Sequence, residues 1–355
     1  MLWTRPFARA PKERAYCKEL NMSQVIQKAV APAPATTAKL KHLVCGAGGS
    51  RAILANAGVL AACDLAGITD WETIGGISGG SIPTVLWRRI STAEMLRFAV
   101  EVDFSSLVPR HATPISTIIA FLLKDRFEYT RPKKGVLSSD KLGAFIDEKV
   151  PVWPKGFWTM AVVAKTQILF TEHGVYQYLS NGQRRVISDT PAPVGLAIRA
   201  SCAVPGIIDS VAYKGRHLFD GALSWDGQCP VGIVTRHFGG KPLEILASDV
   251  GSEKGRFEVF KEKLWMLLCG GHCVEHKGPK SIIPRGVTML KPNVWSVRSL
   301  QFHLTMDQKW QAVMSGFQEA VIELSESGIL AGERLDMALA ICADITKLQA
   351  LAIDK

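Results

Sequence analysis

The amino-acid sequence predicts an α/β protein of three layers, in which helices cover both faces of a central, mostly parallel β-sheet. Short apolar runs typical of strands alternate with longer segments of helical periodicity. This alternation is typical of a parallel sheet flanked by helices. The 355 residues are 47% hydrophobic and 21% charged, which excludes a disordered or fibrous chain. The expected strands span 41–45, 73–77, 159–164, 167–171 and 243–247, and the expected helices span 52–66, 80–90 and 307–325.

Each element has its own signal. The runs 41–45 and 73–77 are short and apolar, and each is followed by glycines and then by a helical segment. The runs 159–164 and 167–171 are separated by two residues and are expected to pair with each other. In 307–325 the apolar side chains recur at spacings of three and four, which is typical of one buried helix face. These side chains are Trp310, Val313, Met314, Phe317, Ala320, Val321 and Leu324.

A linker of proline, alanine and threonine at 31–38 separates an N-terminal segment from the expected folded domain. The predicted organisation is a basic extension with its linker at 1–38, one domain at 39–325 and a C-terminal helical segment at 326–355. Lys and Arg total 42 against 32 Asp and Glu, and residues 1–41 hold eight of these cations and two of the anions. A segment of this charge is attracted to polyanions, although a solvated extension without a partner is an equal alternative.

The sequence also bears on compartment and membrane contact. No apolar stretch reaches the roughly 18 residues that cross a bilayer, and no secretory signal peptide is apparent. The eight cysteines are scattered through apolar segments, so we expect most of them to be buried thiols in a reducing compartment. The expected location is cytoplasmic, with peripheral membrane contact. No RNA- or DNA-binding motif accompanies the basic segment, so nucleic acid is not an expected partner.

The first motif with chemical meaning is Gly76-Ile77-Ser78-Gly79-Gly80, a Gly-x-Ser-x-Gly sequence between an apolar strand and a helix. On such a turn the serine hydroxyl projects beyond the sheet edge, and small neighbours leave it open to a substrate. The following helix directs its positive end toward the same place. This context favours a nucleophilic serine over a chance match in a glycine-rich chain.

The second motif is Gly46-Ala47-Gly48-Gly49-Ser50-Arg51, which also lies between a strand and a helix. Consecutive glycines let several backbone N–H groups point at one spot, where an anion can be held. A dinucleotide fingerprint would need glycine at position 51, and a P-loop would need a following Gly-Lys-Ser/Thr. An oxyanion or small-anion cradle remains.

The third motif is Asp220-Gly221-Ala222, which alone would most often be a turn. Together and in this order, the three motifs resemble the signature of the patatin-like phospholipase family. That signature consists of an oxyanion loop Gly-Gly-Gly-x-Arg/Lys-Gly, a Gly-x-Ser-x-Gly elbow and a later Asp-Gly-Gly/Ala. The segment Ala200-Ser201-Cys202-Ala203-Val204-Pro205 resembles the family's Ala-Ser-x-Ala-x-Pro, which packs near the site. The resemblance covers about residues 40–325.

The resemblance implies the three-layer patatin-like fold for the domain at 39–325 and a serine lipid acyl hydrolase of the phospholipase A or lysophospholipase type. Ser78 would attack the ester carbonyl, and Asp220, poorly solvated, would accept its proton and then activate water. The other implied residues are the oxyanion donors Gly48, Gly49, Ser50 and Arg51, the elbow glycines Gly76, Gly79 and Gly80, and Gly221 with Ala222.

That chemistry requires no metal or organic cofactor. The expected partners are a phospholipid or lysophospholipid substrate and an anionic membrane surface, and the need for a protein activator is left open. The oxyanion loop departs from the family pattern, because alanine stands at positions 47 and 52. Alanine at 47 would be strained if that position required a positive φ.

Two other catalytic interpretations stay open. The chain order Ser78, Asp249, His303 also fits an α/β-hydrolase triad, although the Gly-Gly-x-Arg loop and Asp-Gly-Ala then have no role. An acyltransferase can use the same elbow when water is a poor acceptor.

Two segments have weaker signals. The cysteines and histidines of 269–276 could bind zinc, but their spacing is crowded and a surface loop is the better interpretation. The apolar run 115–123, followed by Lys124, Arg126, Arg131, Lys133 and Lys134, has the order of a membrane anchor and cationic collar, while a core helix leading into a charged loop is slightly favoured.

Overall fold

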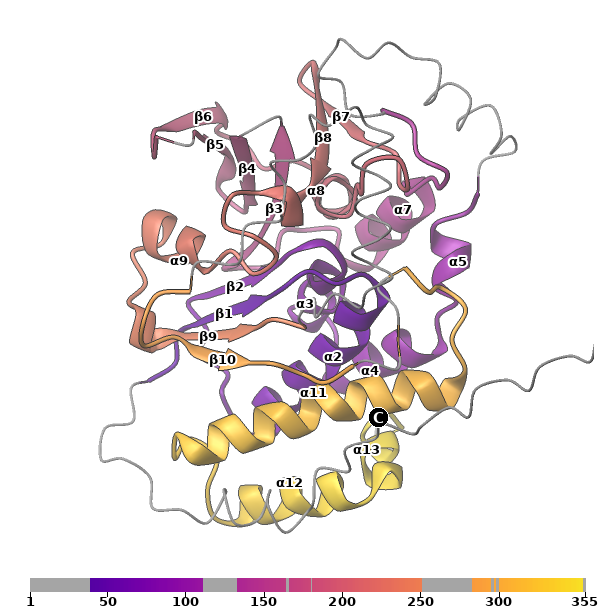
Figure 1. The fold of residues 1–355 in the computed structure, drawn as a ribbon, viewed down its shortest axis with the longest axis vertical. Helices are drawn as coiled ribbons and strands as arrows, with labels where there is room; N and C mark the ends of the chain where they lie inside the picture. Colours follow the sequence, from indigo (N-terminus) through magenta and orange to yellow (C-terminus); the bar gives the residue numbers. More distant parts are fainter. Residues whose placement is uncertain are drawn as a thin grey trace, which may run out of the picture.

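The computed structural model describes residues 39–110, 133–163, 166–179, 181–250, 283–294, 297 and 300–353. Its centre is one sheet with the strand order β10-β9-β1-β2-β3-β4-β5-β6, and β8 pairs with both β3 and β7 (Figure 1). The strands are β1 His42–Cys45, β2 Thr73–Gly76, β3 Phe157–Val163, β4 Thr166–Thr171, β5 Gly174–Tyr178, β6 Arg184–Ser188, β7 Val211–Tyr213, β8 Arg216–Asp220, β9 Ile245–Ser248 and β10 Thr288–Leu290.

The sheet has a parallel and an antiparallel part. Strands β10, β9, β1, β2 and β3 are parallel to one another, whereas β4 and β8 pair with β3 in antiparallel orientation. The pairs β4–β5, β5–β6 and β7–β8 are also antiparallel. The predicted α/β sheet flanked by helices is therefore confirmed. Its antiparallel part extends beyond the one strand pair expected from the sequence, because β5 and β6 continue that hairpin.

Helices cover both faces of the sheet. They are α2 Ser50–Leu65, α3 Ser81–Trp87, α4 Thr92–Glu101, α5 Phe104–Leu107, α7 Asp140–Lys149, α8 Val194–Ser201, α9 Val231–His237, α11 Met306–Glu326, α12 Glu333–Ala343 and α13 Ile345–Leu351. Successive residues of β1 show the two faces, since Leu43 packs with α2 and α11 while Val44 packs with α9. A third cluster joins α8 and β7 to β3, β4 and β5.

The longest helix, α11, crosses α2 at two glycines. A Cβ on Gly58 would lie 1.9 Å from the carbonyl oxygen of Val313, and one on Gly316 would lie 1.9 Å from that of Ala55. The two backbones are therefore in direct contact. The seven apolar residues predicted for the buried face of α11 are all buried.

The cysteines that the structure describes, Cys45, Cys63, Cys202, Cys229 and Cys342, are buried and form no disulfide with one another, as expected. Within the described ranges, no helix combines the length and apolar character that crossing a bilayer requires.

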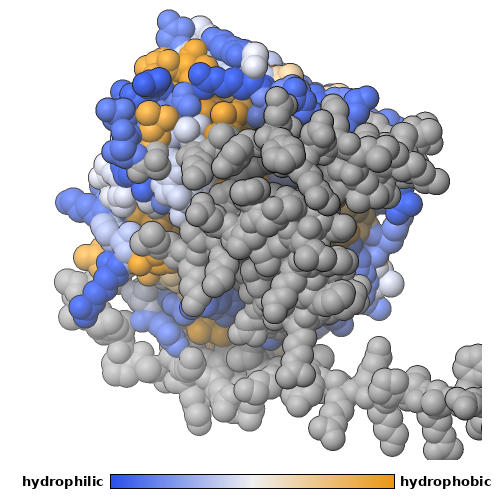
Figure 2. Space-filling model, turned by 45° about the horizontal axis from the view of Figure 1, so that its top comes forward, coloured by the Kyte–Doolittle hydropathy of each residue, from blue (hydrophilic) through white to orange (hydrophobic). Residues whose placement is uncertain are grey.

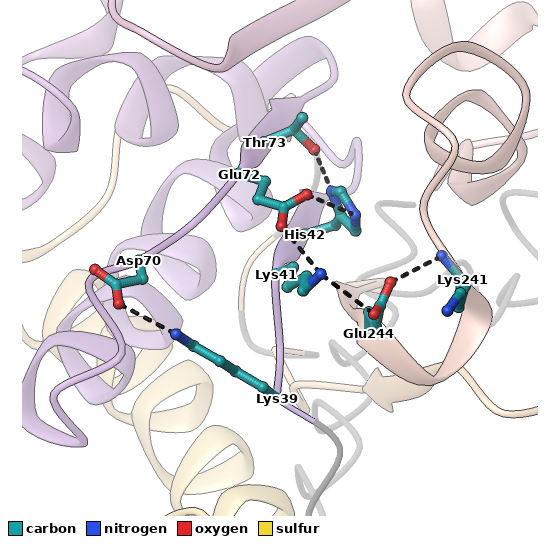
Figure 3. A network of polar contacts seen from close by, with 8 residues as sticks. All are labelled: Lys39, Lys41, His42, Asp70, Glu72, Thr73, Lys241 and Glu244. Atoms are coloured by element: carbon teal, nitrogen blue, oxygen red, sulfur yellow. Dashed lines mark hydrogen bonds and ion pairs between the residues drawn. The ribbon is translucent and has the colours of Figure 1, made fainter.

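An ionic network lies where β1 and β2 begin (Figure 3). Lys41 contacts Glu72 at 3.1 Å and Glu244 at 3.4 Å, and Lys39 contacts Asp70 at 3.2 Å. Lys39 and Asp70 are largely solvated, and Lys41 and Glu244 are partly exposed, so the pairs contribute little to stability. The network marks the amino-terminal edge of the parallel strands, opposite the edge where the sequence motifs converge.

Candidate active site

Ser78 lies on a tight turn directly after β2. It is the first residue of a 3₁₀ turn, Ser78–Gly80, that leads into α3. Its backbone φ of 51° lies in the left-handed region, which residues other than glycine rarely adopt. Two hydrogen bonds hold this backbone. The N–H of Ser78 donates to Oγ of Ser201 over 2.9 Å, and Oγ of Ser81 donates to the Ser78 carbonyl over 2.6 Å.

The glycine-rich loop packs directly against this turn. A Cβ on Gly79 would lie 2.2 Å from the carbonyl oxygen of Gly49, and one on Gly80 would lie 2.3 Å from that of Gly46. Glycine is required at both elbow positions because the two backbones touch. The contact places the start of α2 beside Ser78.

The loop itself is anchored on both sides. The N–H of Gly46 donates to the carbonyl of Ser248 over 2.7 Å, and the N–H of Ala47 donates to that of Gln228 over 2.9 Å. The left-handed backbone falls at Gly49, with φ 58°, and not at Ala47. Alanine at 47 therefore causes no backbone strain, and Ala52 lies buried inside α2.

The helix α2 begins at Ser50, with Gly49 as its N-cap. The first N–H groups of a helix have no carbonyl partner within it, and the helix dipole adds positive potential there. Gly48, Gly49, Ser50 and Arg51 thus lie at the positive end of a 16-residue helix that abuts the serine turn.

Asp220 ends β8 and faces the serine. Its Oδ2 accepts a hydrogen bond from Oγ of Ser78 over 2.6 Å, and its Oδ1 accepts the N–H of Ala222 over 2.8 Å. The residue is 3% exposed, and burial raises the pKa of its carboxyl from 3.8 to about 6 although both hydrogen bonds lower it. Gly221 is also required, because a Cβ there would lie 2.2 Å from the Met160 carbonyl oxygen.

Two supporting contacts were not expected from the sequence. The sequence indicates Ser201 only as part of a motif, and its hydrogen bond to Ser78 spans 123 residues of chain. The segment after Asp220 is held by Asp226, which is 5% exposed, forms an ion pair with Arg236 and accepts a hydrogen bond from Nε2 of Gln167 over 2.8 Å. No local pattern marks either contact.

The alternative triad gains no support from the hydrogen bond described for Ser78 Oγ, which goes to Asp220 and not to His303 or Asp249. His303 lines a shallow depression with Asp103 and Lys309, before α11.

The zinc candidate at 269–276 and the apolar run 115–123 with Lys124, Arg126 and Arg131 lie outside the described residues. So does the extension at 1–38. Within the described part of the chain, no group of three or more metal-ligating side chains comes together.

Known proteins resemble this chain in sequence and in structure. The sequence profile of the patatin-like phospholipase family matches residues 43–233. VipD from Legionella pneumophila is similar in structure with 13% identity and a TM-score of 0.44, over 88% of this chain and 76% of VipD. The human GIVD cytosolic phospholipase A2 is similar with 11% identity and a TM-score of 0.43, over 90% of this chain and 65% of the human chain. A sequence search among curated proteins gave no match. Since the family profile covers more than half of the chain and includes all three motifs, the protein belongs to the patatin-like phospholipase family of lipid ester hydrolases.

Proposed function

We propose that the protein hydrolyses acyl esters of phospholipids or lysophospholipids with Ser78 as the nucleophile and Asp220 as the proton acceptor. The observation that carries this proposal is the 2.6 Å hydrogen bond from Ser78 Oγ to Asp220 Oδ2, between residues 142 positions apart. A serine and a base in hydrogen-bond contact are the minimum for covalent acyl transfer to an enzyme.

In the proposed reaction, Ser78 Oγ attacks the ester carbonyl while its proton passes to Asp220. The backbone N–H groups of the oxyanion loop, at Gly48, Gly49, Ser50 and Arg51, stabilise the negative oxygen of the tetrahedral intermediate. Asp220 then gives the proton to the departing alcohol. Water then attacks the carbonyl of the acyl-enzyme while Asp220 takes up its proton. The fatty acid leaves, and the proton passes from Asp220 to Oγ of Ser78.

The environment of Asp220 supports its role as base. An ordinary carboxylate is a weak base near neutral pH, and burial raises the pKa of Asp220 to about 6. The carboxylate is then still ionised at pH 7 but accepts a proton more readily. The proposed chemistry requires no metal or organic cofactor, and its lipid substrate implies work at a membrane surface.

The test is fatty-acid release from mixed phospholipid and lysophospholipid micelles. We expect Ser78→Ala and Asp220→Asn to abolish release. His303→Ala is the control, because His303 lines a depression with Asp103 and Lys309 to which Ser78 does not contribute, and this variant should retain the wild-type rate. Loss with His303→Ala together with activity in Asp220→Asn would refute the dyad and favour the triad.

The wild-type protein should also release fatty acid when anionic vesicles and a cell extract, as a source of activator, are added. If it releases none under these conditions, hydrolysis is contradicted as the activity.

A further inference from the structure

A group of exposed cations lies on the outer part of the antiparallel sheet. We call it the basic edge patch and define it by its residues, which come from the segment before α7, from β6 and from the β7–β8 hairpin. Among the described residues, none of these cations forms an ion pair with a carboxylate. The patch consists of Lys133, Lys134, Arg185, Lys214 and Arg216.

Hydrogen bonds join the three segments into one surface. The N–H and Oγ of Ser210 both donate to the Lys133 carbonyl, over 3.0 and 2.8 Å, which ties 133–134 to the start of β7. The hairpin reaches β6 through Lys214, whose Nζ donates to the Ile187 carbonyl over 3.2 Å.

Arg216 and Arg185 share one face of the sheet. A guanidinium N–H of Arg216 donates to Oε1 of Gln177 over 2.9 Å, and Gln177 is the direct cross-strand partner of Arg185. Directly opposed residues project from the same face of a sheet. The two guanidinium groups therefore belong to the same continuous surface.

The sheet register places this surface beside the active site. Asp220 and Arg185 lie on one row across the strands, which runs through Ala161, Ile168 and Gln177. Four strand spacings of about 4.8 Å separate them by roughly 19 Å along the sheet. Arg216 begins the strand that ends at Asp220, so it lies about 13 Å beyond the carboxylate, past the carboxyl-terminal edge of β2.

The charge of the surface is positive. Its five cations are opposed nearby by Asp189 and Asp209, and Asp209 accepts the N–H of Gly135 over 2.7 Å, so the local balance is five minus two, or +3. Figure 1 shows β6 and the β7–β8 hairpin at one end of the molecule, and Figure 2, which turns that end forward, shows small apolar patches among hydrophilic side chains.

We propose that the basic edge patch binds the anionic headgroups of a lipid membrane and so holds Ser78 next to its substrate layer. The inference rests on the proposed function, since it names the surface through which that site meets its lipid. Clustered Lys and Arg side chains are attracted to the negative potential of an anionic bilayer, and salt screens that attraction.

The test compares vesicle binding of two variants with equal changes of charge. The patch variant carries Arg185→Gln, Lys214→Gln and Arg216→Gln. The control variant carries Lys39→Gln, Lys241→Gln and Lys347→Gln, which are exposed cations on other parts of the surface. Both are made in the full chain with Ser78→Ala, so binding is measured without hydrolysis, by sedimentation with phosphatidylcholine vesicles with and without phosphatidylserine.

Each cation near an anionic membrane strengthens binding about fivefold. The patch variant lacks three of them, so it should bind phosphatidylserine vesicles about 100-fold more weakly than its parent. The control variant should bind as the parent does. The proposal would be overturned if the patch variant bound as tightly as its parent, or if both variants lost binding equally. A loss of binding that does not depend on phosphatidylserine would also overturn it. Retention on duplex DNA without phosphatidylserine-dependent binding would also overturn it.

Hydrolysis of a water-soluble short-chain ester separates this proposal from the function. With Ser78 intact, the patch variant should turn over that ester at the wild-type rate. If the wild type cleaves no ester, the proposed function fails, while the binding comparison still decides the patch.

Discussion

Replacing Asp220 by asparagine should stabilise the fold above pH 6 while abolishing the proposed hydrolysis. Burial raises the pKa of the Asp220 carboxyl to about 6, against 3.8 for the unperturbed group. An acid with a raised pKa in the folded state binds its proton more tightly there than in the unfolded chain. Asp220 therefore has no pH-dependent effect on folding stability below about pH 3.8. Its ionisation destabilises the folded state progressively from pH 3.8 to about 6, and by a constant amount above that.

The magnitude follows from the two pKa values. The difference, 6 − 3.8 = 2.2 units, corresponds to about 3 kcal/mol of folding free energy at pH 8, and most of it develops between pH 4 and 6. Asparagine has nearly the same shape and no charge. Its Oδ1 can accept the N–H of Ala222, and its Nδ2 can donate to Oγ of Ser78, so the local hydrogen bonds persist.

The assay is urea unfolding of wild type and Asp220→Asn from pH 4 to pH 8. The free energy of unfolding of the variant, relative to wild type, should increase by about 2 to 3 kcal/mol over that range. Asp189→Asn, an exposed carboxylate changed to an amide, is the matched control and should show no such trend. A difference between Asp220→Asn and wild type that does not vary with pH would refute the reasoning that burial destabilises this carboxylate.

Other predictions concern the support of the site. The wild-type kcat/KM for ester hydrolysis should fall tenfold per pH unit below about pH 6, as Asp220 takes up a proton; a profile flat to pH 4.5 would contradict its role as base. Ser201→Ala removes the acceptor of the Ser78 N–H, which should destabilise the folded state by about 1–3 kcal/mol and lower kcat with little change in KM. An unchanged kcat would show that this hydrogen bond does not position the nucleophile. Gly79→Ala should abolish activity with the helical circular dichroism retained, since its Cβ would push the oxyanion loop away; full activity would exclude the contact. Gly316→Ala should destabilise the protein by about 1–3 kcal/mol in thermal unfolding, and a wild-type Tm would contradict the close helix crossing.

Periodicity and turn chemistry identified most strands of the parallel part of the sheet and the helices α2, α3 and α11. The predicted strand at 73–77 is β2, Thr73–Gly76, and the predicted helix at 307–325 is α11, Met306–Glu326. Both have strong local signals, an apolar run before glycines in one and a long three-four spacing in the other. The edge strand β6 was not predicted, because it begins with the exposed pair Arg184 and Arg185 and owes its conformation to pairing with β5.

The candidate site shows a similar division. The motifs indicated Ser78 and Asp220 together only through a family resemblance, since the pairing of β8 with β3 that brings them into contact leaves no local trace. The sequence alone does not show whether alanine at position 47 strains the loop. The backbone angles decide this, because the left-handed position is Gly49. Tertiary hydrogen bonds such as that from Ser78 to Ser201 depend on how distant segments meet, and one-dimensional patterns do not contain that information.

The crossing of α2 and α11 has a consequence for how the enzyme can be divided. The family profile ends at residue 233, yet β9, which anchors the glycine-rich loop, and α11, which fixes α2 from behind, both come later in the chain. A fragment limited to 43–233 would contain every proposed catalytic group but would leave one edge of β1 and the glycine face of α2 uncovered. The smallest unit able to hold the oxyanion donors in place therefore extends through α11.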